Sequence, residues 1–188
     1  FKNEEGRYKE AGNIKNAVPF LHQDPDSDEI LGQCEESGRD QGHATLCVSL
    51  MGAFCQMAYS IGEDLFAFDN YRAVAMAEYV GKYNLIKDEA FNKGTLVGDD
   101  FVYDSNSFPY TSYSNPSYTN TTISTDQRGT KRPAWELFYG YCKAKGISSI
   151  YSGKWAEQMR PDGGGGNYGP NSGGFDQLGF GTLMYYRE

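Results

Sequence analysis

Arg39 and His43 are the two side chains whose types and spacing best fit acid–base chemistry in this chain of 188 residues. A guanidinium is always charged and its fork of donors matches a carboxylate, while an imidazole takes up or releases a proton near neutral pH. His43 is one of only two histidines in the chain. The pair could therefore bind an acid and remove a proton beside it.

A helix is the element expected to position this pair. Ser37 and Asp40 have the spacing of a capping pair. An apolar residue then recurs at helical spacing, at Leu46, Leu50, Phe54, Met57 and Ile61. We expect a helix over residues 38–61 with Arg39 and His43 on one face.

A purely structural interpretation of the same residues is also open. Arg39 could pair with a neighbouring carboxylate, namely Glu35, Glu36 or Asp40, since such pairs are common on helix surfaces. His43 could be a satisfied core histidine in the first turns of the helix.

Three further helices are indicated downstream. One covers residues 66–80, with Gly81 as its stop. Another begins at Pro133, a residue tolerated in a first turn, and ends at Gly146. A short one covers residues 151–160. Residues 86–130 show no sustained period and predict a long irregular segment, which compact domains usually keep for a function.

Two tyrosines in this irregular segment, Tyr110 and Tyr113, are candidates for contact with a ligand. An aromatic ring can stack on the apolar face of a sugar, and a phenol can donate a proton. Both rings could instead only pack the loop. Residues 163–174 hold seven glycines, which allow close backbone approach to an extended ligand, although a surface loop fits equally well. Residues 175–186 predict a last helix.

Composition excludes several classes of function. The net charge is −8 and the isoelectric point is about 4.8, whereas general nucleic-acid binding needs a basic face. No apolar run is long enough for a membrane-spanning helix. The acidic residues 24–29 resemble the start of a calcium loop, but Glu29 stands where that loop needs glycine. We expect no metal and no cofactor, and we expect Cys47 and Cys55 to be core residues.

Two motif blocks resemble the alginate lyase superfamily. The first is residues 36–43 (Glu-Ser-Gly-Arg-Asp-Gln-Gly-His), followed by an apolar helix and then residues 62–65 (Gly-Glu-Asp-Leu). The second is residues 132–136 (Arg-Pro-Ala-Trp-Glu) with the glycine-rich residues 160–183. The blocks occur in the order that the family uses, and the similarity is loose between residues 86 and 130.

The resemblance implies an all-α fold, an (α/α) toroid of paired helices. Such a toroid needs a longer chain, so we expect residues 1–188 to be the C-terminal part of one toroid domain. The remaining toroid helices would come from an N-terminal portion. The family also implies a bacterial enzyme of the periplasm or a secreted one.

The reaction implied is β-elimination on an anionic polysaccharide such as alginate or a glucuronan. Arg39 would neutralise the carboxylate, His43 would act as base, and Tyr110 or Tyr113 as acid. The residues expected to support or bind the substrate are Gln41, Glu36, Arg132, Asn167, Tyr168 and Asn171. Family members also place an asparagine or a second histidine near the carboxylate, and no motif here matches that partner.

Two other classes of function stay open. One is a catalytically silent carbohydrate-binding toroid, which the tyrosine-rich and glycine-rich segments would suit. The other is a glycoside hydrolase with two carboxylates drawn from Glu36, Asp40 and Asp176.

Overall fold

The computed structural model describes residues 12–114 and 119–160. Its α-helices are α1 (Gly12–Ala17), α2 (Gln41–Ser60), α3 (Phe68–Asn84), α4 (Trp135–Lys145) and α5 (Ile150–Met159). Its 3-10 helices are η1 (Glu35–Gly38), η2 (Asp88–Ala90) and η3 (Gly98–Asp100). Two antiparallel hairpins are formed by β1 (Phe20–Gln23) with β2 (Ile30–Gln33), and by β3 (Tyr113–Ser114) with β4 (Thr119–Asn120).

The prediction of an all-α toroid is wrong. About half of the described chain is helical, two small sheets accompany the helices, and the five described α-helices do not close into a ring. The β1–β2 hairpin lies in a segment for which the sequence predicts no strand. Strands of four residues are too short for an alternating pattern to be recognised, and this hairpin depends on packing of β2 against α3, far along the chain.

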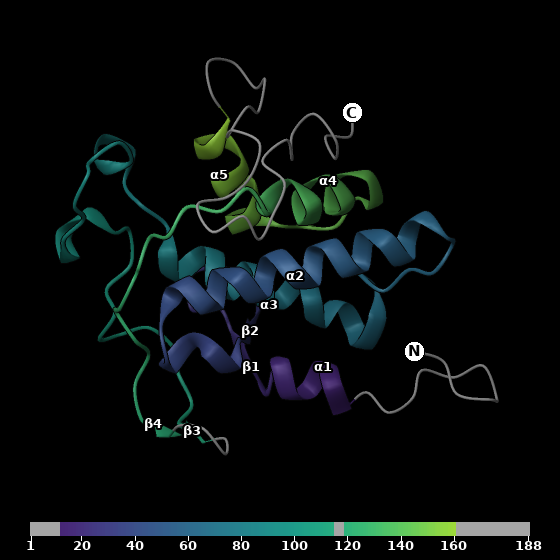
Figure 1. Cartoon of the computed structure of the whole chain (residues 1–188), viewed down its shortest axis with the longest axis horizontal. Helices are drawn as coiled ribbons and strands as arrows, with labels where there is room; N and C mark the ends of the chain where they lie inside the picture. The colour runs from purple at the N-terminus through teal and green to yellow at the C-terminus, as the bar shows by residue number, and fades with distance from the viewer. Residues whose placement is uncertain (1–11, 115–118, 161–188) are drawn as a thin grey trace.

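Helix α3 is the centre of the fold. Figure 1 shows α2 crossing the molecule in front of α3, with α4 and α5 on one side and the β1–β2 hairpin on the other. Every residue of α3 from 73 to 84 is buried. The predicted stop at Gly81 is wrong, because α3 continues to Asn84 and the Trp135 and Tyr151 side chains pack closely on Gly81.

Helix α2 buries a different face from the one that its large apolar residues indicate. Leu50, Phe54, Met57 and Ile61 are all exposed. The buried face consists of small or polar residues: Ala44, Thr45, Val48, Ser49, Gly52 and Cys55. A Cβ on Gly52 would lie 2.8 Å from the Phe138 ring, so this small-residue face lets α2 approach α4 closely.

The C-terminal described helices agree with the sequence. α4 begins at Trp135, two residues after the predicted start at Pro133, and it is capped by Gly146, which takes the left-handed conformation at φ 67°. α5 matches the predicted short helix. Between residues 86 and 130 the described chain is mostly irregular, as predicted. The predicted helix over residues 175–186 and the glycine-rich residues 163–174 lie outside the described residues. None of the described helices combines the length and apolarity needed to cross a bilayer.

A buried charge network joins the β1–β2 hairpin to the helices. Lys82 on α3 is 1% exposed and its ammonium group donates to Asp24 and, at 2.6 Å, to Asp26. Tyr151 on α5 donates its hydroxyl to the other Asp24 oxygen at 2.6 Å. The acidic residues that resemble a calcium loop are therefore used to pair a buried lysine.

Glu78 on α3 stabilises the start of α5. Its carboxylate accepts the backbone N–H groups of Tyr151 at 2.8 Å and Ser152 at 3.0 Å, two donors that the helix itself leaves unpaired. Burial raises the pKa of Glu78 to about 6, although these hydrogen bonds act in the opposite direction.

The raised pKa of Glu78 predicts a pH dependence of stability. Protonated Glu78 is favoured in the folded state. Its contribution to the free energy of unfolding is therefore full below pH 4.5 and is lost as the pH rises through about 6. The loss is about 2 kcal/mol of unfolding free energy. Urea denaturation at about pH 4.5 and about pH 7 measures it. In Glu78→Gln this component should disappear, whereas Glu157→Gln, an exposed change on α5, should keep it.

Candidate functional site

Arg39 and Asp40 form the junction between η1 and α2, so the single helix expected over residues 38–61 is interrupted there. Asp40 is extended, at φ −165° and ψ 160°, and its Oδ1 accepts the His43 backbone N–H at 2.7 Å. Asp40 is therefore the N-cap of α2, a position where aspartate is strongly preferred. Arg39 stands just before the helix rather than on its face.

The Asp40 carboxylate also fixes the ring of His43. Its Oδ2 lies 2.7 Å from His43 Nδ1. A carboxylate can only accept, so Nδ1 carries the proton and the neutral ring keeps its free electron pair on Nε2. The His43 side chain is 41% exposed, and no described residue forms a hydrogen bond with Nε2. The ring is thus oriented on one side and open on the other.

The Arg39 guanidinium lies beside this pair. Its Nε is 3.6 Å from the same Asp40 oxygen that holds His43, and its Nη1 is 3.4 Å from Glu36 Oε2. At 45% exposure these ion pairs are weak, so an incoming carboxylate can compete for the guanidinium. Burial raises the pKa of Glu36, while the Arg39 charge opposes that rise. The structure therefore brings Arg39 and His43 together around one carboxylate.

Gln41 lies beneath this corner and is almost fully buried. Its amide donates to the backbone carbonyls of Ser37 and Ser124 at 2.9 and 3.0 Å, and it accepts from Asn84 at 2.9 Å. Asn84 in turn accepts the Gly129 backbone N–H at 2.9 Å. Gln41 therefore holds the corner to α3 and to the following loop, and these bonds do not go to Arg39 or His43.

The two candidate tyrosines occupy different places. The Tyr110 hydroxyl packs against Gly38, where an added Cβ would lie only 2.2 Å from it, and it is 3.5 Å from the Asn120 carbonyl. Burial raises the pKa of Tyr110. Tyr113 lies on β3 with its ring edge-on to Phe20. Tyr110 therefore packs on the residue directly before Arg39, whereas Tyr113 hydrogen-bonds Glu35 at the start of η1.

Two further residues at this corner are not found by sequence reasoning. Asn120 packs on Gly38, and its buried Nδ2 has no hydrogen-bond acceptor among the described residues. Gln127, in the left-handed region at φ 55°, lies against Gly42, where an added Cβ would be 2.2 Å from its Oε1. The signal available in the sequence is the pair of glycines that flank Arg39 and His43, since glycine admits close neighbours.

The remaining predicted substrate contacts are only partly described. Arg132 donates to Thr45 Oγ1 at 3.3 Å and to the Gly42 carbonyl at 3.5 Å, so it adds a cation near the first turns of α2. The other three, Asn167, Tyr168 and Asn171, lie outside the described residues.

The residues described offer no evident metal site. No group of three or more histidine, cysteine, aspartate or glutamate side chains in them is arranged to hold an ion. His22, the other histidine, lies 2.9 Å from Gln33 Oε1 and stacks on Tyr79.

These geometric features stand without support from known proteins. The chain matches no family model, no curated protein and no solved structure, so the alginate lyase resemblance stays a prediction from its motifs.

Proposed function

We propose that this protein is a polysaccharide lyase that cleaves a uronic-acid-containing polysaccharide by β-elimination. The observation that carries the proposal is the Asp40–His43 pair, with an open Nε2 and the Arg39 guanidinium next to it. A base whose proton-accepting atom faces solvent beside a fixed cation suits abstraction of a proton next to a bound carboxylate.

The proposed reaction divides three tasks among three side chains. Arg39 binds the carboxylate at C5 of the uronic acid and stabilises the negative charge that develops there. His43 Nε2 takes the C5 proton, and the electrons of that C–H bond form the double bond between C4 and C5. The bond from C4 to the glycosidic oxygen breaks, and that oxygen leaves with the bonding pair and takes a proton from Tyr110.

The support for Tyr110 over Tyr113 is its place. Its hydroxyl lies against Gly38, the residue before Arg39, whereas Tyr113 packs on Phe20 and hydrogen-bonds Glu35, four residues before Arg39. A phenol is protonated at neutral pH and can donate to a leaving oxygen.

A hydrolase with paired carboxylates fits this corner less well. Both oxygens of Asp40 are engaged, one in capping α2 and the other in holding His43, so this carboxylate is not free to act on a sugar. Asp176, the third carboxylate considered, lies outside the described residues.

The direct test incubates the intact protein with alginate, glucuronan and glycosaminoglycans. Elimination creates a conjugated unsaturated uronide, so the expected result is a rise in ultraviolet absorbance with at least one polymer. New chain ends without that absorbance would identify a hydrolase instead. Binding without new chain ends would identify a silent carbohydrate-binding protein.

Asp40→Asn is expected to lower kcat about a hundredfold while α2 still forms. Asparagine is also a good N-cap, so its oxygen can accept the His43 backbone N–H. Its amide NH2 group then faces Nδ1 as a donor, which moves the ring proton to Nε2 and removes the base. Steady-state kinetics together with a thermal melt measure the two effects separately.

The matched control is Asp126→Asn, an exposed aspartate in the neighbouring loop. It should leave kcat unchanged. Normal kcat in the Asp40→Asn protein would show that the Asp40 carboxylate does not set the tautomer of His43.

A further inference from the structure

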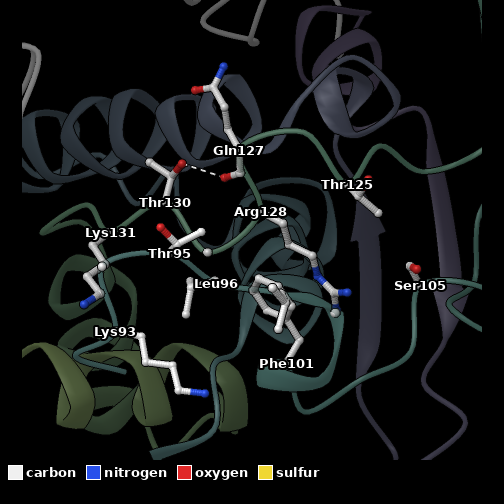
Figure 2. Close-up of a pocket in the computed structure, with 14 residues that line it drawn as sticks. Lys93, Thr95, Leu96, Phe101, Ser105, Thr125, Gln127, Arg128, Thr130 and Lys131 are labelled. Carbon is white, nitrogen blue, oxygen red and sulfur yellow. Dashed lines mark hydrogen bonds between the residues drawn. The ribbon is translucent and has the colours of Figure 1, made fainter. Parts of the chain in front are cut away.

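A pocket of about 790 Å³ lies beside the candidate site and is not used by the proposed reaction. It is bounded by the segment around Lys93 and by residues 125–131 (Figure 2). Its side chains include Lys93, Thr95, Gln127, Arg128, Thr130 and Lys131. This volume is in the range of pockets that hold small molecules or sugar units. Its lining contains three cations and no carboxylate, in a chain whose net charge is −8.

Two of the three cations, Arg128 and Lys131, form no ion pair with a carboxylate of the described residues. Arg128 donates to the backbone carbonyls of Tyr83 at 2.8 Å and Tyr103 at 2.7 Å, and its guanidinium lies 4.2 Å from the centre of the Phe101 ring (Figure 2). Among the described residues it forms no ion pair. Burial lowers the pKa of Arg128, which indicates that its surroundings compensate the charge only in part.

Lys131 is an exposed cation of the pocket. Its ammonium group donates to the Phe91 carbonyl and lies over the Phe91 ring. An ammonium group has three N–H donors, so further donors are available to a ligand. Burial lowers the pKa of Lys131 as well, and no described carboxylate pairs with it. Lys93 differs, because Asp100 already lies 2.5 Å from its ammonium group.

The pocket and the Arg39–His43 corner share a wall. Gln127 lines the pocket, and its side chain lies against Gly42 in the first turn of α2. The Gln41 backbone N–H donates to the Asp126 carbonyl at 2.8 Å, and Asn84 links Gln41 to Gly129. A polymer bound at His43 could therefore continue past Gln127 into the pocket.

We propose that this pocket binds the carboxylate of a second uronic-acid unit of the same polysaccharide, away from the bond that is cleaved. Lys131 and Arg128 supply the charge, and the hydroxyl groups of Thr95 and Thr130 face the sugar hydroxyls. The identity of the polysaccharide rests on the proposed function, but the anionic pocket ligand is tested separately.

The test measures binding in a His43→Ala background, so that the sugar is not degraded. Isothermal titration calorimetry compares uronic-acid oligosaccharides of increasing length with the same oligosaccharides after carboxyl reduction, which makes them neutral. Two pocket changes are compared with the parent, Lys131→Gln and Thr95→Glu. The matched control is Lys15→Gln, an exposed lysine of α1. Lys131 and Thr95 are also exposed, so the fold should tolerate both changes.

The pocket changes should weaken binding of the longer acidic oligosaccharides about tenfold, as expected for one charge-assisted contact. Binding of the shortest ones and of the neutral ones should be unaffected, and Lys15→Gln should match the parent. Equal affinity of Lys131→Gln and the parent for every acidic length would overturn the proposal, as would absence of binding.

The two proposals fail in different ways. If the intact protein shows no elimination but acidic oligosaccharides still bind through Lys131, the lyase assignment fails and the pocket assignment stands. If elimination proceeds and neither Lys131→Gln nor Thr95→Glu changes KM or the affinity, the pocket assignment alone fails.

Discussion

His43→Ala is expected to lower kcat by about a thousandfold or more, because it removes the imidazole that we propose as the acceptor of the C5 proton. Arg39 would still bind the substrate carboxylate, so KM should change little. The fold should survive, since the side chain is 41% exposed and Asp40 Oδ1 still accepts the backbone N–H at position 43. The ultraviolet assay measures the rate, and a thermal melt checks the fold.

The control for His43→Ala is the other histidine. His22 on β1 contacts Gln33 on β2 and Tyr79 on α3, and it forms no described hydrogen bond with Arg39, Asp40 or Tyr110. His22→Ala should therefore keep its turnover even if it melts at a lower temperature. Full activity in His43→Ala would refute the assignment of His43 as the base and would favour a tyrosine acting as both base and acid.

The elements that the sequence predicts well are those whose ends are marked by a nearby proline or glycine. α4 begins two residues after Pro133 and is capped by a glycine in the left-handed region, and these signals depend only on neighbouring residues. The β1–β2 hairpin has no such signal. Its existence depends on contacts with α3 and on the buried Lys82, all distant in sequence.

The face of α2 shows a second limit of pattern reasoning. Large apolar residues at helical spacing predict a buried stripe, yet Met57 and Ile61 are 64% and 80% exposed. The buried face is made of small residues because α2 and α4 approach closely at Gly52. Periodicity locates a helix but does not say which face has a neighbour.

The residue types at the candidate site could be read from the sequence, but their geometry could not. Arg39 and His43 are identified by type, and they do lie together. The helix assumed to carry both is interrupted, and it is Asp40 that joins them. One carboxylate therefore caps α2 with one oxygen and orients the ring with the other, which couples the start of the helix to the proton-accepting atom.

Lys82→Met is expected to cost about 3–5 kcal/mol of unfolding free energy, the largest effect on stability that the described structure predicts. The change leaves the fully buried Asp24 carboxylate without its cation. Burial raises the pKa of Asp24, but hydrogen bonds from Lys82, Tyr151 and neighbouring groups outweigh burial, so the pKa is lowered overall. That stabilisation is full above pH 3.8 and is lost as the pH falls through the lower folded value.

A double variant separates the loss of an ion pair from a general loss of packing. In Lys82→Met with Asp24→Asn the residue at position 24 is neutral, so no uncompensated charge is buried. The double variant should regain more than half of the unfolding free energy that Lys82→Met loses. Urea denaturation followed by circular dichroism measures this recovery. If the double variant is as unstable as the sum of the two single variants, the energetic role of the pair is refuted, and Lys82 contributes only by filling the space between Tyr103 and Tyr151.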